Sequence, residues 1–307
     1  MPDQSGRLAL ITGANSGLGL ESARALLARG ATVLLACRSL ERAEAARQEL
    51  LAGVGAGSAG TVLGRIELLD LDLADLDSVV RAAATVAERF GRLDLLLNNA
   101  GVMAPPRTLT RQGFELQFGV NHLGHFALTR LLLPVLQASP GARVVQVTSG
   151  AQYFGRLNFD DLQGERRYDR WAAYGQSKLA NVVFAHELQR RYPGLLSAAA
   201  HPGLARTNLQ PASIAASGAR FEGVIYGLLD PLFQSAAQGA LPQLFAATAA
   251  EAEPAGHYGP NQFGGMRGWP AAVRPAPAAL DPAQGERLWQ VSEALCRAAS
   301  PAFAPEP

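Results

Sequence analysis

The stretch LALITGANSGLGLESARALLAR, residues 8–29, decides the fold. It begins with the short apolar run LALIT, passes through a glycine-rich turn and continues from Gly17 to Arg29 with the pattern of a helix. Glycines at such a turn let the backbone approach a pyrophosphate, and the free N–H groups at the start of the helix attract its charge. Gly13, Gly17 and Gly19 depart from the commoner Gly-x-Gly-x-x-Gly spacing, which leaves an ordinary tight turn as the alternative. Their place between a strand and a helix favours a dinucleotide site.

Short apolar segments and helix-like segments alternate along the rest of the chain. Further strands are expected at TVLLAC (32–37), RIELLDLD (65–72), LDLLLNNA (93–100), ARVVQVTSG (142–150) and LLSAAAHPG (195–203), and helices at 40–51, 76–90, 123–138, 178–192 and 285–299. Strands that are apolar on nearly every residue and separated by helices indicate a parallel sheet buried on both faces. The sequence therefore predicts an α/β protein with a Rossmann fold, a doubly wound parallel sheet of about seven strands with helices on both faces.

This alternation predicts a single domain over residues 1–299. The Gly/Ala-rich piece at 52–60 has the composition of a linker, but the strand and helix patterns resume directly after it, so we expect a flexible surface turn. Beyond Gly203 the alternation lapses, and residues 204–240 have the mixed composition of a mobile lid over a substrate. The Pro/Ala-rich residues 300–307 predict a disordered tail.

Composition and charge restrict the classes of partner. The 307 residues are 48% hydrophobic and 17% charged with a net charge of +1, and no basic cluster is present, which disfavours nucleic acid. The two cysteines, Cys37 and Cys296, have neither disulfide-framework nor zinc-ligand spacing. An N-terminus without an apolar core and the lack of a run of 18 apolar residues disfavour secretion and a transmembrane segment. We therefore expect a cytoplasmic protein, either a monomer or a homo-oligomer.

The end of the second predicted strand bears on the choice of nucleotide. NAD enzymes of this fold carry an Asp or Glu there for the ribose hydroxyls, whereas this chain has Cys37 followed by Arg38. A guanidinium can pair with the 2′-phosphate of NADP, so we expect NADP(H) to be preferred and NAD(H) to remain possible. The alternative is that Arg38 is a solvated surface charge.

Polar residues gather where the later strands are predicted to end. NNAG at 98–101 and VTSG at 147–150 follow two strands, and VNHLGHF at 120–126 opens the next helix. The carboxyl ends of the strands of a doubly wound sheet face the ligand crevice, so these residues are expected to meet there. Tyr174 and Lys178 are four residues apart and share one side of a helix, which by itself is an ordinary surface pair.

The glycine loop, NNAG, a serine after the VVQV strand and Tyr-x-x-x-Lys, in this order, resemble the short-chain dehydrogenase/reductase family over nearly the whole chain. The longer pieces TGANSGLGLESA, LLACRSLERAEAA, LQFGVNHLGHFALT, YGQSKLANVVFAHEL and HPGLARTNL are most similar to its retinol-dehydrogenase-like branch. The resemblance implies that Tyr174 is the general acid/base and that Lys178 activates it and binds the cofactor ribose. It also implies that Ser149 polarises the substrate carbonyl and that Asn121 supports a proton relay.

The same resemblance implies the cofactor contacts. They are Gly13, Asn15, Ser16, Gly17, Leu18, Gly19, Arg38, Asp72, Leu73, Asn98, Ala100, Gly101, Tyr174, Lys178, Pro202, Gly203 and Thr207. Asp72 is expected beside the adenine, although it could be a helix N-cap, and Pro202-Gly203 could be an ordinary turn. Thr148 competes with Ser149 as the catalytic hydroxyl.

Two histidines in the same segment raise the question of a metal. His122 and His125 are spaced to share a helix face, but no third ligand accompanies them, so we expect packed or capping histidines and no metal site.

The chemistry that these residues support is hydride transfer. A phenol has a pKa of about 10, and a nearby ammonium favours its ionised form, so Lys178 would help Tyr174 to exchange a proton near neutral pH. We expect an NADP(H)-dependent oxidoreductase that interconverts a carbonyl and an alcohol on a small apolar molecule. The alternatives are an NAD(P)+-dependent alcohol or steroid dehydrogenase and, from another class, a catalytically silent cofactor sensor or scaffold. A sensor needs the glycine loop but not the acid/base group.

Overall fold

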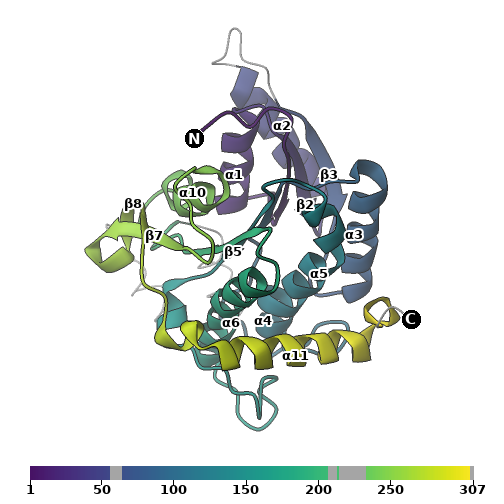
Figure 1. Ribbon diagram of the computed structural model, residues 1–307, viewed down its shortest axis with the longest axis vertical. Helices are drawn as coiled ribbons and strands as arrows, with labels where there is room; N and C mark the ends of the chain where they lie inside the picture. The colour runs from purple at the N-terminus through teal and green to yellow at the C-terminus, as the bar shows by residue number, and fades with distance from the viewer. Residues whose placement is uncertain (56–63, 207–212, 214–232, 305–307) are drawn as a thin grey trace.

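The fold is built on one eight-stranded sheet (Figure 1). The computed structural model describes residues 1–55, 64–206, 213 and 233–304. The strands are β1 (Leu8–Thr12), β2 (Thr32–Cys37), β3 (Ile66–Asp70), β4 (Leu95–Asn98), β5 (Arg143–Val147), β6 (Leu196–Ala200), β7 (His257–Gln262) and β8 (Arg267–Ala272). Their order is β3-β2-β1-β4-β5-β6-β7-β8, and all neighbours pair in parallel except β7 and β8. The order reverses between β1 and β4, where doubly wound sheets bind ligands.

Alternate strand residues enter two separate cores. In β1, Leu8 and Leu10 face one core while Ala9 and Ile11 face the other. Both faces of a strand are therefore buried, which explains the continuous apolar runs in the sequence. The prediction of a doubly wound parallel sheet is confirmed.

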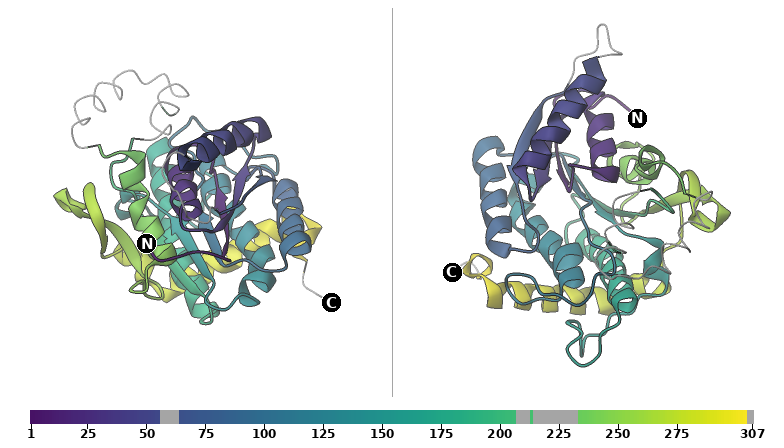
Figure 2. Two further views of the ribbon diagram at one scale, coloured as in Figure 1. Left: turned by 90° about the horizontal axis from the view of Figure 1, so that it is seen from above. Right: turned by 180° about the vertical axis from the view of Figure 1, so that it is seen from behind.

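Helices cover both faces of the sheet (Figures 1 and 2). The α-helices are α1 (Gly17–Leu27), α2 (Leu40–Gly55), α3 (Leu76–Phe90), α4 (Leu116–Phe118), α5 (Gly124–Gln137), α6 (Arg170–Arg191), α9 (Ala236–Gly239), α10 (Leu241–Thr248) and α11 (Pro282–Ala299). A π-helix, η1 (Gly119–Leu123), joins α4 to α5, and short 3-10 helices are η2 (Gly150–Tyr153), η4 (Phe263–Gly265), η5 (Pro277–Leu280) and η6 (Pro301–Phe303). One core packs α1, α2 and α10 against the sheet, and the other packs α3, α5, α6 and α11.

The observed elements depart from the expectations in several places. The sheet has eight strands, whereas about seven were expected. Six of them correspond to the segments named above, and β7 (HYGPNQ) and β8 (RGWPAA) were not recognised because they contain proline and no β-branched residue. Helix α2 continues to residue 55, so residues 52–55 of the expected surface turn are helical, and residues 56–63 lie outside the described part. Helix α6 begins at Arg170, eight residues before the expected start, because Asp169 caps it through Trp171 N and Ala172 N.

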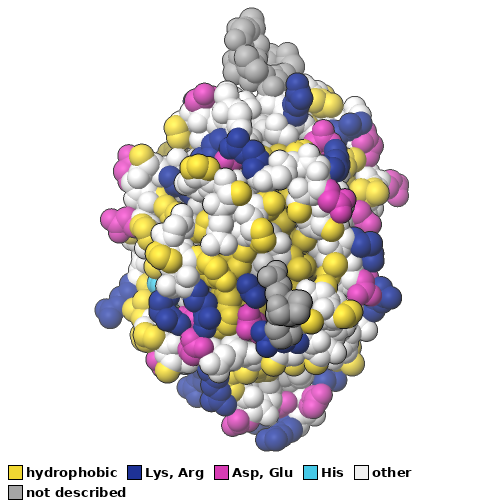
Figure 3. All heavy atoms as spheres, turned by 45° about the vertical axis from the view of Figure 1, so that its right-hand side comes forward, with side chains coloured by type: hydrophobic (Ala, Val, Ile, Leu, Met, Phe, Trp, Pro, Cys, Tyr) yellow, Lys and Arg dark blue, Asp and Glu magenta, His cyan; other side chains and the backbone are white. Residues whose placement is uncertain are grey.

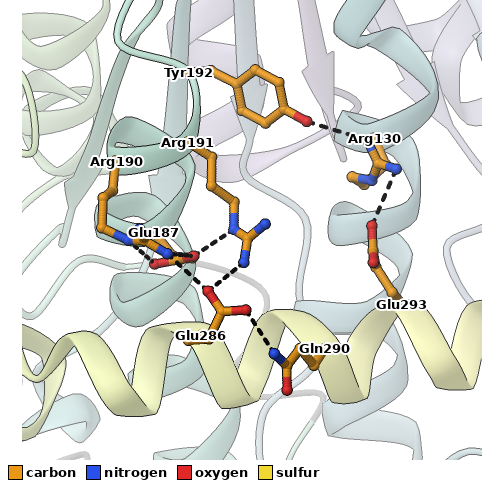
Figure 4. Close-up of polar contacts among 8 residues, drawn as sticks. All are labelled: Arg130, Glu187, Arg190, Arg191, Tyr192, Glu286, Gln290 and Glu293. Atoms are coloured by element: carbon orange, nitrogen blue, oxygen red, sulfur yellow. Dashed lines mark hydrogen bonds and ion pairs between the residues drawn. The ribbon is translucent and has the colours of Figure 1, made fainter.

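Helix α11 is fastened to α6 by a buried carboxylate and its partners (Figure 4). Glu187 of α6 is 2% exposed and accepts hydrogen bonds from Arg190 and Arg191. Both guanidinium groups also donate to Glu286 of α11, at 2.9 and 2.6 Å. The Arg191 guanidinium lies 4.4 Å from the ring centroid of Trp289. Helix α11 is therefore held against the helix that carries Tyr174 and Lys178.

The outer side of α5 meets α11 and the end of the chain. A groove of about 440 Å³ runs between them, lined by Leu131 and Pro134 and also by Arg130 and Glu293, which form an ion pair at 3.1 Å. Apolar side chains gather in the middle of this face, with acidic and basic side chains around them (Figure 3). We expected a disordered tail from residue 300, but residues 301–303 form η6 and Phe303 packs against the core, whereas residues 305–307 lie outside the described part.

Candidate active site

The turn between β1 and α1 forms a cradle of backbone. Gly13 has a φ of +65°, a conformation that favours glycine, and a Cβ on Gly19 would lie 2.5 Å from the Gly13 carbonyl oxygen. Ser16 is the N-cap of α1, yet its side chain accepts no hydrogen bond from the first turn of the helix. The N–H groups of that turn and the space kept by the glycines fit the pyrophosphate of a dinucleotide.

The NNAG turn after β4 docks on this cradle. Thr12 Oγ1 accepts hydrogen bonds from the backbone N–H groups of Asn99 and Ala100, both at 2.9 Å, and Asn99 Nδ2 donates to the Thr12 carbonyl at 2.8 Å. The Asn98 side chain is buried beneath the turn and donates to Thr129 of α5 at 3.0 Å. Asn99, rather than Asn98, lines the pocket described below.

Asn121 lies in the π-helical turn η1. Its Oδ1 accepts from Val102 N at 2.8 Å, and its Nδ2 donates to Val102 O and to Ser177 Oγ, both at 2.9 Å. Single π-helical turns occur often at functional sites. The buried Asn121 amide therefore ties the segment after the NNAG turn to helix α6.

Helix α6 places Tyr174 and Lys178 on one side, one turn apart. Ser177 Oγ donates to the Tyr174 carbonyl at 2.8 Å while it accepts from Asn121. The Lys178 Nζ lies 5.8 Å from the centroid of the Tyr174 ring. The spacing seen in the sequence thus becomes a contact between an ammonium and a phenol inside the protein.

Lys178 is the only lysine of the chain, and it is buried. Its Nζ donates to the Val147 carbonyl at 3.3 Å, and within the described ranges it forms no ion pair with a carboxylate. Burial lowers the pKa of Lys178 from 10.5 to about 8, because water no longer solvates the ammonium. A Cβ on Gly101 would lie 3.3 Å from this Nζ, so glycine keeps the space beside the ammonium open. An ammonium with one carbonyl partner fits the hydroxyl groups of a nucleotide ribose.

The two hydroxyls after β5 differ in what they contact. Thr148 Oγ1 donates to the Lys178 carbonyl at 2.7 Å, so its proton is used within the protein. Ser149 Oγ accepts from Ala151 N at 3.3 Å as the N-cap of η2, which leaves its own proton for a ligand. This arrangement favours Ser149 as the hydroxyl that binds substrate.

A pocket of about 670 Å³ brings several predicted residues together at the carboxyl ends of the strands. Leu18, Gly101, Ser149, Tyr174, Lys178, Pro202 and Gly203 line it. The rest of its wall includes large apolar side chains, namely Met103, Phe154, Trp171, Phe233 and Met266. Such a site can hold an apolar molecule beside a phenol, a serine hydroxyl and an ammonium.

Other predicted cofactor residues lie outside this pocket, after the carboxyl ends of β2 and β3. Arg38 is exposed directly after β2, and Cys37 is buried there with its pKa raised to about 11 by burial. Asp72 Oδ1 accepts from Ala74 N at 2.9 Å, whereas the N-cap of α3 is Asp75. Asp72 is therefore not the helix cap that the sequence left open.

Three further predicted cofactor residues are Asn15, Leu73 and Thr207. Asn15 lies half-buried in the cradle turn, and Leu73 is buried, with its carbonyl against Gly124. Thr207 lies outside the described residues.

The segment after β6 turns sharply at Gly203. Its φ is +65°, and a Cβ there would lie 2.3 Å from the Met266 carbonyl, so the turn needs glycine. Pro202 O accepts from Gln234 Nε2 at 2.7 Å. Of the expected lid, residues 207–212 and 214–232 lie outside the described part.

Sequence reasoning missed several residues around the site. The β7–β8 connection contributes Gly264, Gly265 and Met266 to the pocket, but its strands were not predicted. His201 also lines the pocket and stacks on His257, with ring centroids 5.6 Å apart. The spacing of the HPG piece that contains His201 gave no sign of this contact, because His257 is distant in the sequence.

Comparisons with known proteins give the class. The pattern of the short chain dehydrogenase family matches residues 7–216. Retinol dehydrogenase 14 of Mus musculus is 41% identical over 298 residues, which cover 94% of this chain and 86% of the relative. The crystal structure of an uncharacterized protein from Mycobacterium paratuberculosis superimposes with a TM-score of 0.76 at 39% identity, covering 97% of this chain and 96% of that one. A candidate NAD(P)-dependent gluconate 5-dehydrogenase from Beutenbergia cavernae, solved with NADP at low occupancy, matches with a TM-score of 0.63 at 26% identity, covering 81% and 92%.

The chain therefore belongs to the short-chain dehydrogenase family, in its retinol-dehydrogenase-like branch. It is an oxidoreductase that acts on CH–OH groups with a nicotinamide nucleotide. None of the helices that the structure describes has both the length and the apolar character needed to cross a membrane.

Proposed function

We propose that this protein uses NADP(H) to interconvert a carbonyl and an alcohol on a small apolar molecule. The observation that carries the proposal is the placement of Ser149, Tyr174 and Lys178 around one largely apolar pocket, with Asn121 hydrogen-bonded behind it. A catalytically silent sensor would not need this acid/base group.

Each of these residues has a chemical role in the proposed reaction. The bound nucleotide supplies or accepts the hydride. In reduction, Tyr174 gives its phenolic proton to the substrate oxygen while Ser149 donates a hydrogen bond to the same oxygen. Lys178 lowers the cost of the resulting phenolate through its charge, and it is placed to bind a ribose. Oxidation returns the proton to Tyr174 by the same path.

The apolar character of the substrate follows from the pocket wall. Met103, Trp171 and Met266 can bury hydrocarbon, and among the described residues of the wall the charged side chain is Lys178. Retinol dehydrogenase 14 is named for an apolar alcohol, which supports the same class of substrate for this chain.

The preference for NADP rests on the end of β2. Arg38 is exposed and Cys37 carries no carboxylate, so a 2′-phosphate would meet a guanidinium and no negative side chain at these two positions. The solved relative that contains NADP supports this choice. We also propose a reducing compartment such as the cytoplasm, because Cys37 and Cys296 are both buried and unpaired.

A substrate panel tests the proposed function. Apolar aldehydes and ketones are assayed with NADPH and NADH, and the matching alcohols with NADP+ and NAD+, following the nucleotide absorbance. We expect turnover with NADP(H) above that with NAD(H), and its loss in Tyr174→Phe. Tight NADPH binding without turnover on any substrate would instead indicate the silent sensor.

A further inference from the structure

A chain of hydrogen bonds joins the two helical layers beneath the active site. On one side of the sheet, Gln243 of α10 is 2% exposed and donates to Ser22 of α1 at 2.8 Å and to Asn99 Oδ1 at 3.2 Å. Asn99 Nδ2 continues the chain to the Thr12 carbonyl at 2.8 Å. Thr12 ends β1, so the chain reaches the sheet at the glycine cradle.

His125 of α5 continues the chain on the other side of the sheet. Its Nε2 lies 2.8 Å from Thr12 Oγ1, and its Nδ1 lies 3.0 Å from the Asn121 carbonyl oxygen. A carbonyl only accepts, so Nδ1 carries the proton and donates to Asn121. In the neutral ring Nε2 then accepts the Thr12 hydroxyl proton, and Thr12 Oγ1 accepts the N–H groups of Asn99 and Ala100.

This arrangement uses every hydrogen-bonding atom of the imidazole. His125 has no exposed surface, and burial lowers its pKa to about 4, so the ring stays neutral at physiological pH. The Leu97 carbonyl is the other acceptor near the Thr12 hydroxyl, but it lies at 3.5 Å, further than His125 Nε2. The contacts therefore define one tautomer and one ring orientation.

We propose that His125 is a positioning residue that holds the Asn121 backbone and the Asn99-Ala100 turn in register with each other. This inference rests on the proposed function, because the turn would bind the nucleotide and Asn121 would support the acid/base group. His125 reaches the first through Thr12 and the second directly.

The location of Asn121 explains why the hydrogen bonds of His125 would affect the site. The Gly124 N–H donates to the Gly119 carbonyl, five residues back. The backbone hydrogen bonds around Asn121 therefore follow the i→i−5 pattern of a π-helix and not the i→i−4 pattern of an α-helix. A Cβ on Gly101 would lie only 3.1 Å from Asn121 Oδ1 and 3.3 Å from Lys178 Nζ. A small shift of the Asn121 backbone would therefore move groups at the floor of the site.

Three substitutions of His125 separate its two hydrogen bonds. His125→Asn keeps a donor near the position of Nδ1 and loses the Thr12 contact, whereas His125→Gln keeps an acceptor near the position of Nε2 and loses the donor to Asn121. His125→Leu loses both contacts while it keeps apolar volume. Each variant is measured for kcat at saturating substrate and nucleotide and for NADPH dissociation by fluorescence.

We expect a crossed pattern of effects. Loss of the Asn121 contact should lower kcat by about tenfold in the Gln and Leu variants, the usual size of one buried hydrogen bond. Loss of the Thr12 contact should raise the NADPH Kd about tenfold in the Asn and Leu variants. If the Leu variant fails to fold, the Asn and Gln variants still carry the test.

His122→Leu is the matched control, because His122 is also fully buried but bonds to Ser292 of α11 at 2.8 Å, away from the nucleotide turn. Its kcat and Kd should stay within about twofold of the parent. Parent-like values in all His125 variants, or equal losses in His122→Leu, would overturn the proposal. A parent without turnover would refute the proposed function, and the NADPH Kd would still test the part of His125 that acts through Thr12.

Discussion

Replacing Lys178 by methionine should stabilise the nucleotide-free protein at neutral pH. The ammonium is buried, and within the described residues its hydrogen-bond acceptor is the Val147 carbonyl at 3.3 Å. A methionine fills similar space without a charge. The same change should abolish turnover and weaken NADPH binding if Lys178 is, as proposed, both the ribose ligand and the activator of Tyr174.

The size of the gain follows from the pKa. Burial lowers the pKa of Lys178 from 10.5 to about 8, and each pKa unit corresponds to about 1.4 kcal/mol, so the buried charge costs roughly 3 kcal/mol at pH 7. The lost hydrogen bond offsets about 1 kcal/mol of this. The Val147 carbonyl keeps Asn181 Nδ2 as a donor at 3.2 Å, so it is not left unpaired. We therefore expect a net gain in the free energy of unfolding of about 2 kcal/mol.

The pH dependence of this gain has a definite sign. The folded protein releases the Lys178 proton near pH 8, whereas the unfolded chain keeps it up to about pH 10.5. Between these values the unfolded state binds more protons, so the parent becomes more stable relative to the variant as the pH rises. The advantage of Lys178→Met should be complete below about pH 8 and should disappear towards pH 10.5.

Urea unfolding of both proteins, freed of nucleotide and compared across this pH range, measures the difference. Lys178→Arg is the control, because its guanidinium cannot release a proton and should give no gain at any pH. A methionine variant less stable than the parent at pH 7, or a gain that persists unchanged at pH 10.5, would refute the reasoning.

Three further predictions concern the phenol, the nucleotide and the α6–α11 contact. Tyr174→Phe should leave the fold and NADPH affinity near normal and lower kcat by at least ~10²-fold, and an unchanged kcat on every accepted substrate would remove Tyr174 from the chemistry. Cys37→Asp combined with Arg38→Leu should invert the ratio of kcat/KM for NADP and NAD at fixed low salt, and a ratio that does not move would make Arg38 a solvated charge. Glu187→Gln should lower the free energy of unfolding by roughly 1–3 kcal/mol, because its guanidinium partners lose a buried carboxylate. Glu44→Gln, at an exposed ion pair, should change it by less than about 1 kcal/mol, and an equal loss there would contradict this interpretation.

The regular part of the fold could be predicted closely from the sequence. Strands β1 and β2 and helix α3 match the expected bounds, because their apolar patterns are continuous and Gly91 ends α3 in a left-handed conformation. Strands β7 and β8 could not be predicted, since they form by pairing beside β6 and with each other and not by the preference of their own residues.

The candidate site was predictable where its residues share a local motif. Helical spacing was enough to place Tyr174 and Lys178 on one side of a helix, but their assignment to the acid/base group rests on the family resemblance. The glycine cradle was expected from its place between β1 and α1. Contacts between distant segments were not predictable, because the topology of the sheet decides them. The Thr12–His125 hydrogen bond spans 113 residues, so the sequence could only suggest a packed or capping histidine.

The buried ammonium also links the stability of the protein to its ligand. Within the described part, Lys178 has no carboxylate partner, so the folded chain bears the cost of this charge until a polar ligand reaches it. Ribose hydroxyl groups beside Nζ would restore part of the lost solvation, and binding to the folded state alone stabilises it further as the ligand concentration rises. Helix α6, which carries the lysine, is itself held by the contacts of Arg190 with Glu187 and Glu286 and by the hydrogen bond from Asn121 to Ser177. The buried Lys178 charge therefore opposes folding in the absence of a ligand, and the proposed nucleotide would relieve part of that cost on binding.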